Sequence, residues 1–176
     1  MAGGPPEAHR DPPDPPLDPD ALAAWTFAPI GVVLSPLRYV HDAPRQPGPR
    51  GADGRIVLRR GLQNAVRDLA GFERIWVVFV LSFARGWRAQ VRPPRDDRKR
   101  GVLATRAPHR PNPIGLSCVR LRGVRGREIE IAGHDLLHGT PVLDIKPYVP
   151  YCDAFPDAAT GWLGELGDDG PDHRWE

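Results

Sequence analysis

The sequence predicts an all-β domain, either a barrel or a sandwich, and two observations point to this class. The 176 residues include 22 prolines and 19 glycines, which argues against a helical bundle because both residues destabilise helix interiors. Six or seven segments have the apolar patterns of short strands, and only one has a clear helical pattern. The length is that of one domain and is sufficient to bury a core.

The N-terminal half of the domain predicts three strands and one helix. Strands are expected over residues 27–34, 55–60 and 75–83, and the last is a nearly continuous apolar run that suits the centre of a sheet. Residues 61–70 predict a short helix, because apolar side chains recur there at helical spacing. Residues 41–54, which are rich in proline and glycine, predict a loop.

The C-terminal half predicts four more strands, over residues 102–105, 116–121, 128–131 and 142–149. Turn-forming residues at 123–126 join the second and third of these strands, which we therefore expect to form a hairpin. Cys118 lies in an alternating apolar strand, so we expect its side chain to be buried in the core.

The composition divides the chain into three parts, and the charge is unevenly distributed along it. Residues 1–24 predict a disordered, Pro-rich tail, residues 25–162 the β domain, and residues 163–176 an acidic C-terminal tail. The formal net charge is +2, yet residues 21–150 alone have a net charge of +12. Such a basic body suits a polyanionic partner such as RNA, and a merely solvated arginine-rich surface is the alternative.

Several classes of protein and site are disfavoured by what the sequence lacks. It has no apolar run long enough to cross a membrane and no secretory signal, so we expect a soluble, cytoplasmic protein. Its two cysteines and six histidines form no metal-binding pattern, and no metal is expected. It contains neither a glycine-rich dinucleotide fingerprint, nor a P-loop, nor a G-x-S-x-G nucleophile turn.

Residues 104–117 combine a stiff backbone with a dense set of polar side chains. The three prolines in this segment restrict φ and remove amide donors, so we expect an ordered loop outside the strand ladders. The loop contains Arg106, His109, Arg110 and Asn112, which it would present to a ligand at small entropic cost. The alternative is a plain strand connection whose arginines are solvated.

A second segment, residues 135–148, places three functional side chains on one face of a predicted strand. Asp144, Lys146 and Tyr148 alternate, whereas the apolar side chains between them face the other way. The three groups fit a structural ion pair beside a tyrosine at a rim, and they fit an acid–base site equally well. The spacing leaves both interpretations open.

Two further segments are rich in basic residues. Pro44–Gly48 is a short loop stiffened by proline, with an arginine and a glutamine between its prolines. Residues 85–100 contain seven basic side chains around Trp87, a mixture that suits an RNA backbone with a stackable base, although a solvated loop explains it nearly as well. We expect Arg92 and Arg95 in this segment to contact the substrate.

Taken together, these segments resemble the TrmO/YaeB/TsaA/VirR family. Its members have a P-R-Q-P-G loop, a W-x-x-F strand, a basic loop with two prolines, an A-T-R-S-P-x-R-P-N-P-I-G-L-S stretch and a D-L-x-[DH]-G-T-P-V-x-D-I-K-P-Y stretch. The corresponding stretches here are Pro44–Gly48, Trp76–Phe79, residues 92–95, Ala104–Ser117 and Asp135–Tyr148. The similarity covers residues 25–162, which is nearly the whole domain.

The resemblance implies both a fold and a reaction. The implied fold is a single-sheet TsaA-like β-barrel with one or two short helices, which forms a homodimer and binds S-adenosylmethionine near the subunit interface. The implied reaction is methylation of the exocyclic amine of threonylcarbamoyl-modified adenosine, next to the anticodon of tRNA.

The resemblance implies the cofactor contacts, and the chemistry of the reaction suggests the catalytic candidates. The implied cofactor contacts are Pro44, Arg45, Gln46, Ser82, Phe83, Arg106, Leu116, Asp135, Leu136, Leu137 and His138. The expected substrate contacts are His109, Arg110, Asn112, Arg92 and Arg95. Asp144 and Tyr148 are candidates for accepting a proton from the acceptor amine, and Lys146 or Arg106 for stabilising the developing charge.

Three departures from the family pattern leave alternatives open. Ser82 stands where the family strand usually ends in histidine, and His138 stands where many members have aspartate. Longer members have a further C-terminal domain thought to help hold tRNA, whereas this sequence ends 14 residues after Trp162. The alternatives are an S-adenosylmethionine-dependent methyltransferase of a small molecule and a non-catalytic RNA-binding barrel.

Overall fold

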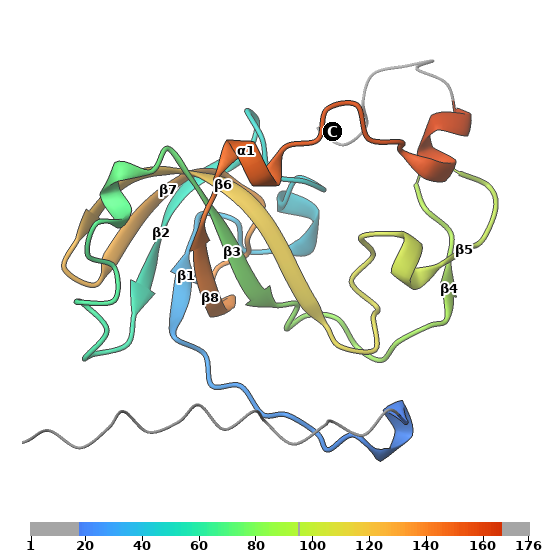
Figure 1. Ribbon diagram of the computed structural model, residues 1–176, viewed down its shortest axis with the longest axis horizontal. Helices are drawn as coiled ribbons and strands as arrows, with labels where there is room; N and C mark the ends of the chain where they lie inside the picture. Colours follow the sequence, from blue (N-terminus) through green and yellow to red (C-terminus); the bar gives the residue numbers. More distant parts are fainter. Residues whose placement is uncertain (1–17, 95, 167–176) are drawn as a thin grey trace, which may run out of the picture.

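The computed structural model describes residues 18–94 and 96–166, and its centre is a closed barrel of six strands (Figure 1). The barrel strands are β1 (Gly31–Leu34), β2 (Ala52–Leu58), β3 (Arg74–Val80), β6 (Ile114–Arg125), β7 (Glu128–His134) and β8 (Pro141–Pro147). The other elements are β4 (Gln90–Val91), β5 (Arg100–Gly101), the helix α1 (Pro150–Asp153) and the 3₁₀ segments η1 (Pro19–Ala21), η2 (Val40–Asp42), η3 (Leu69–Gly71), η4 (Val102–Ala104) and η5 (Gly161–Leu166). The predicted all-β, single-sheet barrel is therefore confirmed.

The order of the strands brings three connections to one end of the barrel. The strands pair in the order β1-β2-β7-β6-β3-β8, β8 closes onto β1, and every neighbouring pair is antiparallel. Because β1, β3 and β7 consequently run in the same direction, they finish at the same end of the barrel. We call this the loop end; it consists of residues 35–51, 81–113 and 135–140, which follow β1, β3 and β7.

The long connection between β3 and β6 extends to one side of the barrel and contains the small β4–β5 hairpin and η4 (Figure 1). The segment η5 is joined to this extension by the indole nitrogen of Trp162, which donates to the carbonyl oxygen of Ala104 at 2.9 Å. The predicted terminal tails fall mainly on residues 1–17 and 167–176, which lie outside the described residues.

The core fills the inside of the barrel with alternating side chains from its strands. Branched aliphatic residues supply most of it, since they suit pleated, buried surfaces; the fully buried ones include Val33, Ile56, Ile75, Val77, Val119, Ile129, Ile131 and Val142. Gly115 lies directly against the ring of Phe79, and a Cβ atom at Gly115 would stand 2.3 Å from the Phe79 Cζ atom. Glycine at this position therefore makes room for the aromatic ring in the barrel.

The predicted helix over residues 61–70 is wrong. The backbone there forms successive turns, with hydrogen bonds between residues three apart, such as from the amide of Ala65 to the carbonyl of Leu62, and ends in η3. Asp68 adopts a left-handed conformation with φ of 66°, which an α-helix does not allow. The apolar spacing identified the residues that face the core, since Val66 is buried, but not the backbone conformation.

Three further details of the prediction are corrected by the structure. Residues 102–105 form no strand: Val102–Ala104 are η4, and the hydroxyl of Thr105, which follows η4, donates to the carbonyl of Val102 at 2.9 Å. The first strand begins at Gly31 instead of residue 27, and Phe27 is exposed. Cys118 is only half-buried, because it pairs with Trp76 on the outer face of the sheet while its neighbour Val119 faces the core.

Two findings on the described residues bear on function. Over residues 18–94 and 96–166, no helix is long and apolar enough to cross a membrane. In the same part of the chain, no group of three or more His, Cys, Asp or Glu side chains could hold a metal ion.

Candidate functional site

Most of the residues predicted to bind a cofactor lie in the three connections of the loop end. Residues 44–46 belong to the first connection, Ser82, Phe83 and Arg106 to the second, and residues 135–138 to the third. Leu116 lies near the start of β6, on its outer face, and is 55% exposed. The topology thus gathers segments that are far apart in the sequence.

Arg106 links the first two connections. Its Nη1 atom donates to the side-chain oxygen of Gln46 at 2.7 Å. The guanidinium group is exposed and Gln46 is half-buried, so the pair stands at the surface of the loop end. A guanidinium that binds a neutral amide keeps its full charge available for an anionic ligand.

Asp135 brings the third connection to the same place. The hydroxyl of Ser117, a buried side chain on β6, donates to the Asp135 Oδ1 atom at 2.7 Å. Burial raises the pKa of Asp135 above 3.8, and the hydrogen bond from Ser117 and the charge of Arg106 act in the opposite direction. Gln46, Arg106 and Asp135 therefore converge in a single chain, with one cation and one partly buried carboxyl group.

His134 supports this arrangement from inside the barrel. Its side chain is fully buried, and its Nδ1 atom accepts the amide hydrogen of Leu136 at 3.2 Å. The proton of a neutral imidazole is therefore assigned to Nε2, which has no hydrogen-bond partner among the described residues. Burial lowers the pKa of His134 below 6.5, so the neutral ring is the form that fits the fold.

Two glycines let the first connection approach the end of β7. The amide of Gly48 donates to the carbonyl oxygen of Gly133 at 2.9 Å. Gly133 has φ of 66°, and a Cβ atom there would stand 2.8 Å from the carbonyl oxygen of Gly48. This close contact fixes residues 44–48 beside the 135–138 turn.

His138 is bound to the chain that follows β1. Its Nδ1 atom accepts the amide hydrogen of Ser35 at 3.3 Å, and its own amide donates to the carbonyl oxygen of Leu37 at 2.8 Å. Both bonds hold the 135–138 turn against β1. The imidazole thus has a structural partner at the position where many relatives of the predicted family have aspartate.

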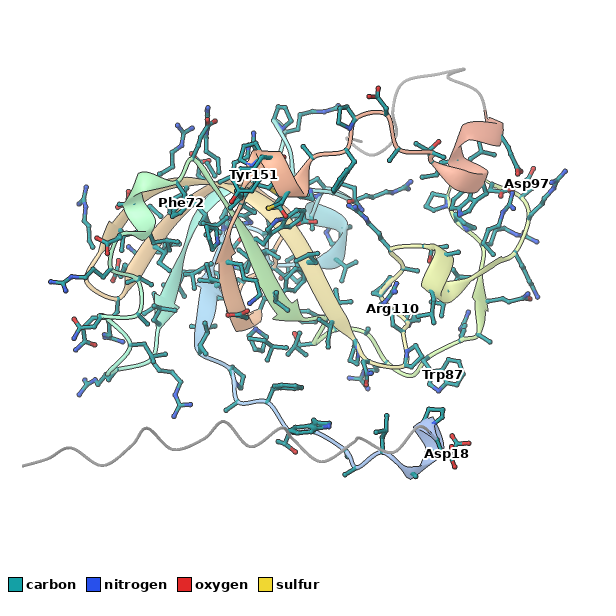
Figure 2. All side chains as sticks on the ribbon, in the orientation of Figure 1. Asp18, Phe72, Trp87, Asp97, Arg110 and Tyr151 are labelled. Carbon is teal, nitrogen blue, oxygen red and sulfur yellow. The ribbon has the colours of Figure 1, made fainter. Side chains whose placement is uncertain are left out.

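The predicted substrate contacts fall into two groups. Arg92 and Asn112 are exposed, and the backbone carbonyl of half-buried His109 accepts the amide hydrogen of Arg88 at 3.2 Å. Arg110, by contrast, lies within the curve of the long connection, whereas Trp87 projects at its edge (Figure 2). The remaining predicted contact, Arg95, lies outside the described residues.

Two of the three predicted catalytic residues, Asp144 and Lys146, lie on β8, and the third, Tyr148, directly follows it. Asp144 and Lys146 form an ion pair of 2.8 Å on the outer face of the sheet, with exposed fractions of 46% and 67%. Tyr148 packs against Trp76, and its amide donates to the carbonyl of Arg74 at the start of β3. Because β8 begins at the loop end and rises by about 3.3 Å per residue, Tyr148 lies roughly 20 Å along the strand from that end.

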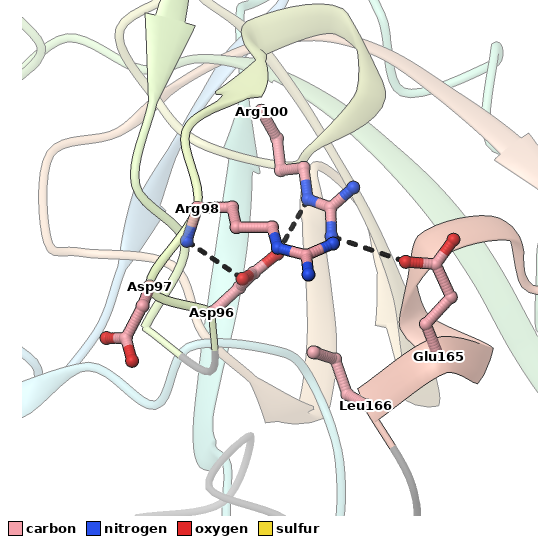
Figure 3. A pocket seen from close by; sticks show the side chains of 6 residues that line it. All are labelled: Asp96, Asp97, Arg98, Arg100, Glu165 and Leu166. Atoms are coloured by element: carbon pink, nitrogen blue, oxygen red, sulfur yellow. Dashed lines mark hydrogen bonds and ion pairs between the residues drawn. The ribbon is translucent and has the colours of Figure 1, made fainter.

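A surface pocket of about 400 Å³ lies at the tip of the long connection. It is lined by Asp96, Asp97, Arg98, Arg100, Glu165 and Leu166 (Figure 3). The Nε atom of Arg100 donates to Asp96 at 2.6 Å, and the backbone amide of Arg98 is the main cause of the lowered pKa of Asp96. These residues include none of the predicted cofactor contacts, and their mutual pairing marks a structural cluster.

Sequence reasoning missed two residues that build the site. Ser117 closes the Ala104–Ser117 motif, and its inward direction follows from the alternation of β6 once Val119 is known to be buried. His134 immediately precedes the Asp135 turn, but nothing in the sequence indicates that a histidine there is fully buried.

With this geometry established, comparisons with known proteins identify the family. The family model of the tRNA-methyltransferase O (TrmO) N-terminal domain matches residues 32–154. The chain belongs to this family. The matched range includes all three connections of the loop end, while η5 lies beyond it.

Similarities to individual proteins and solved structures are consistent with the assignment to the TrmO family. The tRNA (adenine(37)-N6)-methyltransferase of Escherichia coli K12 is 39% identical over 152 residues, which are 80% of this chain and 65% of that protein. A probable S-adenosyl-L-methionine-binding protein of Pyrococcus abyssi is 38% identical over 138 residues, which are 78% of this chain and 75% of that protein. A crystal structure of TrmO from Pseudomonas aeruginosa superposes with a TM-score of 0.69 at 39% identity, over 80% of this chain and 63% of that one. The chain thus spans slightly less than two thirds of the E. coli and P. aeruginosa relatives.

Proposed function

We propose that this chain is an S-adenosylmethionine-dependent methyltransferase that acts on the exocyclic amine of adenosine 37 in tRNA. The observation that carries this proposal is the convergence of Gln46, Arg106 and Asp135 at the loop end, within the range matched by the TrmO N-terminal domain. The names of the E. coli and P. abyssi relatives support both the reaction and the methyl donor. The finer expectation, that the adenosine already has its threonylcarbamoyl group, is part of the proposal.

The residues of the loop end fit S-adenosylmethionine chemically. The Arg106 guanidinium suits the carboxylate of the methionine part, and the Asp135 carboxylate suits ammonium or ribose hydroxyl donors. The other expected contacts are Pro44, Arg45, Ser82, Phe83, Leu116, Leu136, Leu137 and His138. When bound, S-adenosylmethionine supplies an electrophilic methyl group attached to a sulfonium.

The contribution of the chain to the reaction is positioning and proton transfer. Residues 44–48 and 135–138, fixed by the Gly48–Gly133 bond, orient the donor and exclude water. The acceptor amine is a weak nucleophile because it is conjugated with the purine, so removal of its proton assists attack. We assign the proton to Asp144 or Tyr148, and stabilisation of the developing charge to Lys146 or Arg106.

This assignment requires two chains for one working site. Asp144 and Lys146 pair with each other on the outer face of the barrel and Tyr148 packs against Trp76, whereas Arg106 is bound to Gln46 at the loop end. The same outer face contains Ile114 and Leu116, which are 44% and 55% exposed and suit a protein contact. We therefore propose a homodimer in which β8 of one subunit completes the loop end of the other.

The RNA partner is supported by charge and by exposed groups. Residues 21–150 have a net charge of +12, and Arg92, Asn112 and the aromatic ring of Trp87 are exposed in the long connection. Exposed arginines contact phosphates, and an exposed indole provides a surface on which a base can stack. The proposed location is the cytoplasm, where tRNA is modified.

The experiment that tests this function combines binding with product analysis. Calorimetric titration with S-adenosylmethionine should show one site per chain, and no binding would leave a non-catalytic RNA-binding barrel. The purified protein is then incubated with the donor and with tRNA that either has or lacks the threonylcarbamoyl group, and nucleosides are analysed by mass spectrometry. A new methyl group on the adenosine-37 amine supports the proposal. If S-adenosylmethionine binds but neither tRNA is methylated, the result contradicts the tRNA proposal and favours a methyltransferase of a small molecule.

The dimer is tested separately. Light scattering should give twice the mass of one chain, and mixing Arg106→Ala chains with Asp144→Ala chains should restore activity in the heterodimer. A monomer with full specific activity would contradict the shared site. A dimer without complementation would place both residues on the same side of the site.

A further inference from the structure

We infer that Arg110 is a positioning residue for Arg106 and not a contact for the substrate. This inference rests on the proposed function, because it gives Arg106 a ligand to hold. The sequence places both arginines in the same Pro-stiffened loop, and their chemistry alone suggests that both face a ligand. The structure separates them: Arg106 is exposed, whereas Arg110 is half-buried.

The guanidinium of Arg110 is directed at the backbone of its own loop. Its Nη1 atom lies 2.7 Å from the carbonyl oxygen of Thr105, 3.4 Å from that of Ala107 and 3.3 Å from that of Val102. Thr105 and Ala107 are the residues immediately before and after Arg106. One side chain thus binds the backbone on both sides of Arg106, and links it to η4.

Two neighbouring residues of this turn, Thr105 and Ala104, have further hydrogen bonds. The Thr105 hydroxyl donates to the carbonyl of Val102 and accepts the amide hydrogen of Ala107 at 3.2 Å. From the other side, the indole of Trp162 on η5 donates to the carbonyl of Ala104 at 2.9 Å. The Trp162 ring also packs under the Arg100 guanidinium, with 5.1 Å from the Arg100 Cζ atom to its centre. These contacts leave the side chain of Arg106 as the exposed cation of a fixed turn.

The half-buried position of Arg110 suits a guanidinium. A guanidinium is planar, delocalised and weakly hydrated, so its Nη1 atom can lie among carbonyl groups that point inward from one turn. A lysine ammonium is a compact, strongly hydrated charge that would lose more of its hydration at the same place. Without Arg110, the carbonyls of Thr105 and Ala107 lose their side-chain partner, and the backbone at Arg106 gains freedom that a bound ligand must remove.

The test compares Arg110→Lys with Arg106→Ala and with the double variant. If Arg110 acts through Arg106, Arg110→Lys weakens S-adenosylmethionine binding by roughly 3- to 30-fold, always less than Arg106→Ala does, because the Arg106 contact sets the upper limit. The double variant then binds no more weakly than Arg106→Ala alone. Additive losses in the double variant would show independent roles and overturn the inference.

Two controls separate positioning from RNA contact. Arg92→Ala, at an exposed predicted phosphate contact, should reduce the salt dependence of tRNA binding, whereas Arg110→Ala, which removes the same charge, should leave that dependence unchanged. Arg60→Ala, an exposed arginine that follows β2 at the opposite end of the barrel, should change neither measurement. A reduced salt dependence in Arg110→Ala would assign Arg110 to the substrate instead.

A readout without any ligand keeps the inference distinct from the proposed function. Hydrogen exchange followed by mass spectrometry should show faster exchange in peptides covering residues 102–107 of Arg110→Lys, with peptides from β3 and β7 unchanged. Faster exchange with no S-adenosylmethionine binding in the unmodified protein would retain the role of Arg110 in the turn and refute the proposed function. Unchanged exchange would refute the positioning role, whatever the protein binds.

Discussion

Replacing Ser117 by alanine removes one hydroxyl group from the barrel interior and leaves its charged partner in place. The Ser117 hydroxyl donates to Asp135 at 2.7 Å, and the Ser117 side chain is buried. A hydrogen bond to a charged group contributes about 1.5–3 kcal/mol, so we expect the free energy of unfolding at pH 7 to fall by that amount. For a domain of this size the loss corresponds to a decrease in Tm of about 3–12 °C.

The loss should depend on pH, and its sign follows from the pKa of Asp135. The hydrogen bond from Ser117 lowers the pKa of the native carboxyl group, which burial has raised above 3.8, so Ser117→Ala raises that pKa further. The two proteins therefore differ most where Asp135 is ionised in both. As the pH falls through the native pKa values, the carboxyl group becomes protonated and the charge-dependent part of the difference disappears. Because burial raises both native pKa values, this loss occurs at a higher pH than it would for an exposed aspartate.

Urea unfolding measured at pH 7 and at pH 4 tests this reasoning. The matched comparison introduces Ser117→Ala into an Asp135→Asn background, where the partner has no charge and the cost should be smaller and independent of pH. A cost of Ser117→Ala that is the same at both pH values in the native background would refute the assignment of a charged hydrogen bond. If Ser117→Ala lowered the free energy of unfolding at pH 7 by less than about 0.5 kcal/mol, the expected strength of this hydrogen bond would be refuted.

Three further predictions concern neighbouring features. Arg106→Ala should weaken S-adenosylmethionine binding about 10- to 150-fold in a calorimetric titration, because a charge-assisted contact is lost, and unchanged affinity would exclude Arg106 as a principal contact. His134→Leu should reduce the loss of stability that the protein shows as the pH falls below 6.5. Burial lowers the pKa of His134 in the native state, so the unfolded chain binds the proton first and is favoured at low pH. If urea unfolding gave the same pH dependence of the unfolding free energy for both proteins, this reasoning would be contradicted. Gly115→Ala should cost about 1–3 kcal/mol by overpacking against Phe79, with partial recovery in the Phe79→Leu background, and an unchanged Tm would show that the ring moves freely.

The sequence was most informative about strands whose side chains alternate or are continuously apolar. The run from Ile75 lies in β3 at the centre of two antiparallel pairings, and residues 128–131 lie in β7 after a tight turn, both as predicted. The prediction failed at residues 61–70 and 102–105. The apolar positions there identify which side chains face the core, but tight turns and 3₁₀ hydrogen bonds can bury those side chains as well as a helix or a strand can.

The candidate site was predicted in its segments but not in its geometry. Proline-rich and glycine-rich motifs predicted loops that face a ligand, and the structure brings Gln46, Arg106 and Asp135 of these segments together within one chain. What the sequence could not show was the direction of individual side chains. Arg110 differs from Arg106 only in which way its guanidinium points, and that direction is set by the fold of the turn. Long-range pairing likewise decides that the Asp144–Lys146 ion pair lies on the outer face.

The order of the barrel strands has a consequence for folding during synthesis. The first barrel strand, β1, closes onto the last, β8, through the pairs Gly31–Val142 and Val32–Pro141, which are about 110 positions apart in the sequence. Until β8 has left the ribosome, the sheet stays open, and β3 is one of its edges. An apolar strand with an unpaired backbone is a template for association with other chains. We therefore expect the segment Pro141–Pro147 to protect the nascent protein from aggregation, because a chain interrupted before it would leave the backbone of β3 unpaired at the sheet edge.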